Sequence, residues 1–278
     1  MQIKARGSVL DLSTPKVMGI LNVTPDSFSD GGTHNRYHDA LEHVAKMVEH
    51  GATIIDIGGE STRPGAAEVS VNEELDRVIP VVEAIAQRFD VWISVDTSKA
   101  QVMAEAANAG MHIINDIRSL HEPDALDVAA KTGLPVCIMH MQGQPRTMQE
   151  APNYENVVRE VKDYLDAEIT RCVSAGIERR QIILDPGFGF GKNLSHNYQL
   201  LANLEQFHNF GLPLLAGMSR KSMIGQLLNV PPQERLAGSL TCAVIAAMQG
   251  AHIIRVHDVK ETVQAMQVVQ MTLSEKEK

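Results

Sequence analysis

The sequence predicts an α/β protein: a single (β/α)8 barrel, or TIM barrel, that spans residues 1–278 and begins with a short hairpin. Eight short apolar runs each precede a helical pattern, and no long linker divides the chain. The length of 278 residues also suits this fold, which typically takes about 250 residues. An open, doubly wound sheet is the alternative. The eight even units and the absence of a GxGxxG motif after the first strand count against it.

The expected strands are rich in β-branched and apolar residues, as strands buried on both faces are. After a hairpin over residues 2–12, they are expected at 17–23, 53–57, 91–95, 112–117, 136–140, from 182, at 214–218 and at 253–256. The segments between them have amphipathic helical spacing. A helix is expected between Asp96 and Asn108. The other helices are expected at 39–49, 72–89, 124–132, 153–175, 195–207, 221–228, 234–248 and 259–273.

Composition and charge narrow the class of protein. Apolar residues make up 44% and charged residues 21% of the chain, as in ordinary globular proteins. A net charge of −9 offers no basic surface for nucleic acid or an anionic membrane, so local basic residues must capture any anionic substrate. Cys137, Cys172 and Cys242 are widely spaced and odd in number, which favours reduced thiols. With no signal-peptide core or membrane-spanning run, a cytoplasmic protein is expected.

The stretch ILDPGFGFGK at residues 183–192 is the most informative in the chain. It begins as a buried strand that ends on Asp185, because Pro186 and Gly187 disfavour its continuation. Burying a carboxylate there costs free energy unless a partner is present. The glycines that follow let the backbone approach a flat ligand, and Phe188 and Phe190 supply aromatic faces. One such Asp alone would be better explained as a cap.

Repetition of this pattern favours a ligand site over separate caps. Polar residues end nearly every expected strand: Asn22, Asp56, Asp96, Asn115, Asp116, His140, Asp185, Ser219, Lys221, Arg255 and His257. In a barrel the carboxyl ends of the strands surround one mouth, where the active sites of this fold lie.

The residue types at these ends indicate the ligand's chemistry. Asp96, Asn115 and Asp185, with Lys221 as a donor, suit a flat heterocycle that has amino and ring N–H groups on one edge and a carbonyl on another. Arg255 and His257 lie two residues apart, so they project from one face of a strand. With Arg63 they indicate an anion site for phosphate or diphosphate.

Two loops after the first two strands are expected to act as lids. They are Pro25–Gly32 and Glu60–Ala66, and both are rich in Gly, Pro, Ser and Thr. Surface turns have the same composition. Arg63, between Thr62 and Pro64, favours a role as a clamp for an anion or a carboxylate.

Eight motifs in order along the chain together resemble the dihydropteroate synthases. They are MGILNVTPDSFSDGG (18–32), IDIGGESTRPGA (55–66), ISVDTSK (93–99), INDI (114–117), MHMQGQPRTMQ (139–149), ILDPGFGFGK (183–192), GMSRKSMIG (217–225) and RVHDV (255–259). No single motif would be specific, but eight in register cover essentially the whole chain. No motif position departs from the family's pattern.

The resemblance implies condensation of 7,8-dihydropterin-6-ylmethyl diphosphate with 4-aminobenzoate to 7,8-dihydropteroate and diphosphate in folate biosynthesis. Dissociative substitution is expected, because a well-stabilised diphosphate is a good leaving group and a cation on the pterin methylene is delocalised. The resemblance also implies inhibition by sulfonamides, which imitate aminobenzoate, and a Mg²⁺ cofactor.

The resemblance further assigns roles to individual residues. The pterin would be bound by Asp96, Asn115, Asp185, Lys221, Met139, Gly217 and Arg255. The diphosphate would be bound by Asn22, Thr62, Arg63, Arg255, Val256 and His257, with Asn22 also holding Mg²⁺. The 4-aminobenzoate would be bordered by Phe28, Thr62, Arg63, Pro64, Phe190, Ser219 and Lys221.

Three other functions remain open at this point. A pterin-binding barrel of the methyltetrahydrofolate-dependent methyltransferase type would share the Asp and Asn clamp, although Arg63 and the Arg-x-His pair favour a diphosphate. A Schiff-base aldolase would use Lys221 or Lys192. A barrel that only binds a ligand would show no turnover.

The last two helices are more apolar than one buried face requires. The apolar residues lie at 240–248 and 263–271, so a homodimer through these helices is expected.

Overall fold

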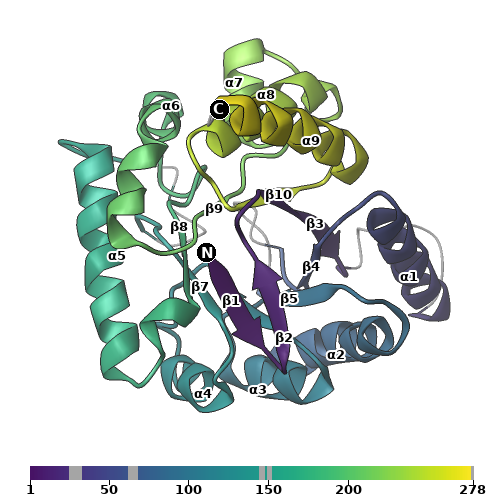
Figure 1. Ribbon diagram of the computed structural model, residues 1–278. Coiled ribbons are helices and arrows are strands. Elements are labelled where there is room, and N and C mark those ends of the chain that lie inside the picture. The colour runs from purple at the N-terminus through teal and green to yellow at the C-terminus, as the bar shows by residue number, and fades with distance from the viewer. Residues whose placement is uncertain (25–32, 62–67, 144–147, 149–151, 277–278) are drawn as a thin grey trace.

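The computed structural model describes residues 1–24, 33–61, 68–143, 148 and 152–276. Within them, eight parallel strands form one closed ring, viewed end-on in Figure 1. In chain order they are β3 (Lys16–Asn22), β4 (Ile54–Gly58), β5 (Trp92–Asp96), β6 (Ile113–Asp116), β7 (Val136–Met139), β8 (Ile182–Asp185), β9 (Leu215–Ala216) and β10 (Ile253–Val256).

The ring closes at two seams. β10 pairs with β3, with Arg255 opposite Met18. A parallel bridge joins Leu184 to Leu214, and Leu184 N donates to Pro213 O at 2.8 Å, so β8 meets the chain that leads into β9. The predicted (β/α)8 barrel is therefore confirmed, and the open doubly wound sheet is wrong.

Helices surround the ring in Figure 1. In the described residues they are α1 (Thr33–Glu49), α2 (Val71–Arg88), α3 (Ala100–Ala109), α4 (Ala125–Thr132), α5 (Val157–Ser174), α6 (Leu194–Ala202), α7 (Ser222–Leu228), α8 (Leu236–Met248) and α9 (Val259–Lys276). The helix expected at 195–207 is instead α6 followed by a 3₁₀ segment, Leu204–Phe210. Leu204 and Phe207 are both buried, and their spacing of three residues suits a 3₁₀ turn as well as an α-helix.

The expected hairpin consists of β1 (Gln2–Ala5) and β2 (Ser8–Asp11), which pair antiparallel. Its turn residues Arg6 and Gly7 both have positive φ angles, 52° and 81°, as a tight hairpin turn requires. Ile3 and Leu10 are buried in the main core. Gln181, just before β8, donates to Lys4 O at 2.6 Å. The hairpin therefore covers the amino-terminal end of the barrel and leaves the carboxyl ends of the strands to form the mouth.

The core of the protein is apolar, and its three cysteines are not in disulfides. Isoleucine, valine and leucine from the strands and helices form one large buried cluster. Cys137, Cys172 and Cys242 are buried free cysteines. Among the described residues, no helix has both the length and the hydropathy that crossing a bilayer would require.

Candidate active site

An arginine held between two carboxylates occupies the centre of the mouth. Arg255 on β10 donates from Nε to Asp56 Oδ2 at 2.6 Å and from Nη2 to Asp96 Oδ2 at 3.0 Å. The carboxylate of Asp56 is completely buried, whereas the Arg255 side chain is 19% exposed. Burial raises the pKa of Asp96 to about 7, and the Arg255 guanidinium works against that rise. Near neutral pH the Asp96 carboxyl can therefore exchange its proton while it remains paired with Arg255.

Asn115 joins this cluster from β6. Its Nδ2 donates to both oxygens of Asp56, at 3.2 and 3.3 Å. Because the amide nitrogen faces Asp56, the side-chain oxygen of Asn115 is the atom that can accept a hydrogen bond from a ligand. The sequence placed Asp56 at a strand end without giving it a role, and the structure shows that it orients both Asn115 and Arg255.

Asp185 and Lys221 lie on the other side of the mouth. Asp185 is buried and accepts a hydrogen bond from Gly187 N at 2.7 Å. Burial raises the pKa of Asp185, with the Lys221 ammonium opposing the rise. Lys221 donates to Phe188 O at 2.6 Å and lies 4.6 Å from the centre of the Phe190 ring. Burial lowers the pKa of Lys221 to about 8, while Asp185 raises it.

The glycines after Asp185 are needed for close approach. Gly187 and Gly191 have φ angles of 73° and 61°. A Cβ on Gly187 would lie 1.9 Å from His140 O, and one on Gly191 would lie 2.3 Å from Gln142 O. The loop therefore packs directly on the chain that leaves β7, and no larger residue fits there.

This packing builds an apolar wall beside the charged groups. Met139 and Phe190 are buried together with Met148 in a small cluster separate from the main core. Gly217 adds space on the opposite side, because a Cβ there would touch the Arg255 side chain at 3.6 Å. A slot with apolar walls and polar groups at its edge suits a flat heterocycle.

Ser219 and His257 form a second polar pair. Ser219 Oγ lies 3.0 Å from His257 Nδ1 and accepts a hydrogen bond from His257 N at 3.1 Å. The hydroxyl of the buried Ser219 therefore contacts both the ring and the main chain of His257. Val256 is buried in the main core, so only its main chain can meet a ligand at the mouth.

Asn22 ends β3 beside Gly58. Its Oδ1 lies 3.6 Å from the position that a Cβ on Gly58 would occupy, so the missing side chain leaves room for Asn22 to extend across β4. The described residues contain no group of three or more His, Cys, Asp or Glu side chains placed to hold a metal ion. A Mg²⁺ ion would fit Asn22 as one oxygen ligand among phosphate oxygens and water, which is how proteins often bind it.

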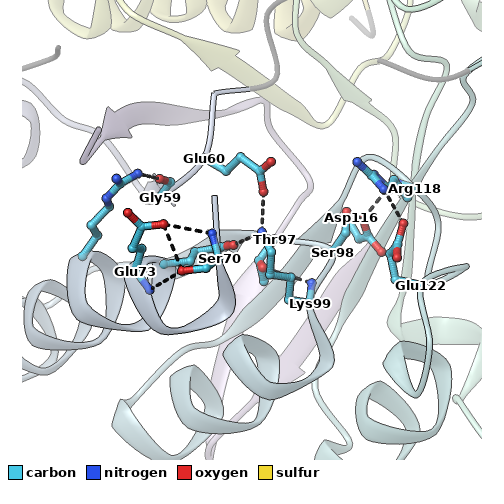
Figure 2. A network of polar contacts seen from close by, with 12 residues as sticks. Gly59, Glu60, Ser70, Glu73, Thr97, Ser98, Lys99, Asp116, Arg118 and Glu122 are labelled. Atoms are coloured by element: carbon cyan, nitrogen blue, oxygen red, sulfur yellow. Dashed lines mark hydrogen bonds and ion pairs between the residues drawn. The ribbon is translucent and has the colours of Figure 1, made fainter. Parts of the chain in front are cut away.

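A polar network links the chain after β4 to the chain after β5, and the chain after β5 to the end of β6 (Figure 2). Lys99 pairs with Glu60, just after β4, and with Glu74 on α2. Arg77, also on α2, donates to Gly59 O at 2.9 Å. Ser70 and Glu73 form a capping box where α2 begins. The described ends of the chain around residues 62–67 are therefore both anchored to α2.

Not every strand-end residue points into the mouth. Asp116 accepts from the backbone of Arg118 and Leu120, each at 2.8 Å, and so stabilises the turn after β6. His140 packs against Tyr164 on α5, with ring centres 4.9 Å apart. The expectation that both belong to the ligand site is wrong, because each follows an inward-facing residue and so faces outward.

The structure thus brings most of the predicted site residues together at one end of the barrel. Those with described positions there are Asn22, Asp96, Asn115, Met139, Asp185, Phe190, Gly217, Ser219, Lys221, Arg255, Val256 and His257. Phe28, Thr62, Arg63 and Pro64 lie outside the described residues.

A family model, curated relatives and solved structures agree on the kind of protein that this chain resembles. Residues 18–257 match the family described as pterin binding enzyme. The chain is 73% identical over 277 residues to a dihydropteroate synthase of Escherichia coli K12, covering 100% of this chain and 98% of the relative. Yersinia pestis dihydropteroate synthase with a sulfonamide drug is 69% identical, with a TM-score of 0.95, covering 99% of this chain and 100% of that one. Xanthomonas albilineans dihydropteroate synthase with 4-aminobenzoic acid is 48% identical, with a TM-score of 0.93 and 98% of each chain covered.

Proposed function

The chain belongs to the pterin-binding enzymes, and within them to the dihydropteroate synthases, and from that premise we propose how its own residues carry out the reaction. The mouth of the barrel joins 7,8-dihydropterin-6-ylmethyl diphosphate to 4-aminobenzoate and releases diphosphate and 7,8-dihydropteroate. The observation that carries this proposal is the hydrogen-bonded group of Asp56, Asp96, Asn115 and Arg255 at the carboxyl ends of their strands, where Asp185 and Lys221 also lie beside the apolar cluster of Met139 and Phe190.

Asp185 and Asn115 recognise the pterin edge. The carboxylate of Asp185 accepts from the amino and ring N–H groups, and Asn115 Oδ1 accepts from another ring N–H. Lys221 donates to the pterin carbonyl or ring nitrogen. Met139 and Gly217 line the two faces of the slot, and Arg255 lies against the ring. Charge-assisted hydrogen bonds to Asp185 contribute roughly 1.5–3 kcal/mol each.

The acidic groups also suit the charge that develops during the reaction. The C–O bond to diphosphate breaks and its electron pair leaves with the diphosphate, so positive charge spreads from the methylene into the pterin ring. Asp56, Asp96 and Asp185 supply negative charge around that ring. The aniline nitrogen then forms the new C–N bond and loses one proton. Because attack is on a cation, positioning the amine is sufficient and no strong base is needed.

The diphosphate is bound at the opposite end of the slot. His257 and Arg255 contact its oxygens, with Asn22, the main chain of Val256, and the predicted Thr62 and Arg63 completing the anion site. When bound, Mg²⁺ would neutralise charge on the leaving diphosphate. Asn22 is the residue of this chain that we assign to it.

The 4-aminobenzoate lies against Phe190 and Lys221, with Ser219 at its border. The remaining residues assigned to it, Phe28, Thr62, Arg63 and Pro64, come from the sequence alone. Since the similar Yersinia pestis enzyme was solved with a sulfonamide drug, we propose that sulfonamides occupy the same place in this protein.

The rival chemistries gain no support from the structure. An aldolase lysine must present an amine to its substrate. The Lys192 ammonium instead donates to main-chain carbonyls of its own loop, and Lys221 donates to Phe188 O. No observation favours a methyltransferase or a barrel that only binds a ligand.

Turnover tests the proposal as a whole. The purified protein is incubated with the pterin diphosphate, 4-aminobenzoate and Mg²⁺, and the products are separated by chromatography. We expect 7,8-dihydropteroate and diphosphate in equal amounts, with neither formed when 4-aminobenzoate is replaced by benzoate. Absence of dihydropteroate under these conditions would show that the proposed reaction is wrong.

His257→Ala separates recognition of the diphosphate from recognition of the pterin. We expect it to weaken binding of the pterin diphosphate at least tenfold, because a charge-assisted hydrogen bond is lost, and to leave binding of the alcohol 6-hydroxymethyl-dihydropterin unchanged. Calorimetry with both ligands measures this. His38→Ala, on an exposed side chain of α1, is the matched control. Equal losses for the two ligands would rule out His257 as a diphosphate residue.

We also propose that the protein is a cytoplasmic homodimer in which residues 1–278 form one folding unit. Ile245 and Met248 on α8 and Val268 and Met271 on α9 are exposed, and the two helices lie side by side in Figure 1. A second copy of this chain would cover these side chains.

Charge placed on this surface tests the dimer. Val268→Glu combined with Met271→Glu is expected to convert a dimer into a monomer, because two carboxylates would have to be buried unpaired. Light scattering at micromolar concentration measures the mass. Val173→Glu, at an exposed apolar residue on α5, should leave it unchanged. A monomer mass for the parent protein would refute the dimer directly.

A further inference from the structure

Lys192 is a buried lysine that the proposed reaction does not use. Only 2% of its surface is exposed. Its Nζ lies 2.8 Å from Gly187 O, 2.9 Å from Phe190 O and 2.9 Å from His140 Nδ1, with His140 O at 3.3 Å. Three main-chain carbonyls and one imidazole nitrogen therefore surround a single side-chain nitrogen.

The contacts fit an ammonium ion. An ammonium has three protons to donate, and the three shortest contacts all lie at 2.8 or 2.9 Å. A neutral amine would have only two protons for these acceptors. Burial lowers the pKa of Lys192, and the Asp185 carboxylate works in the opposite direction. Asp185 and the surrounding carbonyl oxygens favour the charged form, in opposition to burial.

His140 is fitted to be an acceptor at this site. Its ring is held edge-on by Tyr164, with centres 4.9 Å apart, and lies 6.0 Å from the ring of Tyr154. Burial, together with the Lys192 charge, lowers the pKa of His140 to about 2. Because this keeps the imidazole neutral near pH 7, its Nδ1 can accept a hydrogen bond from Lys192 when the ring proton is on Nε2.

The acceptors belong to the loop that carries the proposed ligand groups. Gly187 accepts from Lys192 through its oxygen and donates through its nitrogen to Asp185, at 2.7 Å. Phe190 accepts through its oxygen, while its ring lies under Lys221. One ammonium thus holds both ends of the turn from Gly187 to Phe190, and His140 ties that turn to the end of β7.

We propose that Lys192 is a positioning residue: its ammonium fills an internal cation site built by Gly187, Phe190 and His140, and so holds Asp185 and Phe190 in the geometry that the two substrates need. This inference rests on the proposed roles of Asp185 and Phe190. Lys192 itself touches neither substrate and acts through the loop.

The first test is Lys192→Met, which keeps the length of the side chain but removes its charge and its donors. We expect a folded protein whose KM for the pterin diphosphate and KM for 4-aminobenzoate both rise at least tenfold, because the carbonyls turn away and the loop shifts. Lys131→Met, at an exposed position on α4, is the matched control and should keep both KM values. Folded Lys192→Met protein with both KM values within twofold of the parent would overturn the proposal.

His140 gives an independent test if Lys192→Met does not fold. His140→Leu removes the acceptor, whereas His140→Asn places an amide oxygen near the position of Nδ1. The Leu variant should raise both KM values, and the Asn variant should restore them toward the parent. A role in stability alone would lower the melting temperature of the Leu variant and leave KM unchanged, which would also overturn the proposal. Nitrogen NMR should show His140 protonated on Nε2, and protonation on Nδ1 would contradict the cation site.

Asp185→Asn and Phe190→Ala, measured in the same assays, distinguish a failure of the positioning role of Lys192 from a failure of the proposed roles of Asp185 and Phe190. Raised KM values in these variants together with parent values in Lys192→Met would overturn the positioning role alone. Unchanged KM values in Asp185→Asn and Phe190→Ala would remove these residues from the site, and the positioning role would fall with them.

Discussion

Replacing Arg255 with methionine is expected to cost about 3–5 kcal/mol of folding stability at pH 8, because it leaves the buried carboxyl of Asp56 and the partly buried carboxyl of Asp96 without their shared cation. In the parent protein the guanidinium donates to Asp56 and to Asp96. Methionine fills much of the same volume but offers neither a charge nor a donor. Asn115 would remain as a hydrogen-bond donor to Asp56, but it cannot replace the positive charge that Arg255 provides to Asp96.

The loss should be smaller at pH 5. Burial already raises the pKa of Asp96 to about 7 against an ordinary value of 3.8, and without Arg255 the folded pKa must rise further. Between the unfolded and folded pKa values the folded state binds more protons than the unfolded chain. The stability associated with Asp96 is therefore fully present below its unfolded pKa and decreases as the pH rises through its folded pKa. Protonation at pH 5 removes one of the unpaired charges.

Urea denaturation of parent and variant at pH 5 and pH 8 measures both effects. Arg220→Met is the control, because Arg220 pairs with Asp258 at the surface, is 40% exposed, and should contribute no more than about 1 kcal/mol. Adding Asp56→Asn to Arg255→Met should recover part of the loss. If Arg255→Met costs no more than Arg220→Met and shows no pH dependence, Arg255 does not compensate these carboxylates.

Asp185→Asn is expected to weaken pterin binding at least tenfold while the barrel remains folded. The substitution replaces an ionised acceptor of charge-assisted hydrogen bonds, worth roughly 1.5–3 kcal/mol each, with a neutral amide that must also accommodate two donors. The amide oxygen can still accept from Gly187 N, which limits the effect on the loop.

Calorimetric titration with 6-hydroxymethyl-dihydropterin measures this affinity. Asp166→Asn, at an exposed position on α5, is the matched control and should bind as the parent does. Parent-like affinity in Asp185→Asn would exclude Asp185 from the pterin site.

The fold was predictable because most strands are marked locally by a short β-branched or apolar run, and many of the loops by Gly or Pro. Closure of the ring was not visible in any one segment, since β9 is only two residues long and Leu214 completes the seam with β8. Its expected length of five residues, 214–218, counted residues that follow the strand toward Ser219 as part of it.

The place of a side chain at the mouth was predictable where it lies at or next to the end of an apolar strand, as Asp185 and Asn115 do. The role of Asp56 was not, because its partner Arg255 lies 199 residues away and meets it only through the stagger of the closed barrel. Asp116 and His140 were misplaced for a local reason. Neighbouring residues in a strand face opposite sides, so Asn115 and Asp116 cannot both point into the mouth.

The most direct measurement of the proposed site is a crystal structure of the protein with a bound 6-hydroxymethylpterin. We expect the heterocycle in the slot beside Met139, with its amino and ring N–H edge within hydrogen-bonding distance of the Asp185 carboxylate and Asn115 Oδ1. The hydroxymethyl group should point toward His257. A pterin bound elsewhere, or bound in the slot with its polar edge away from Asp185 and Asn115, would contradict the assignment of these residues.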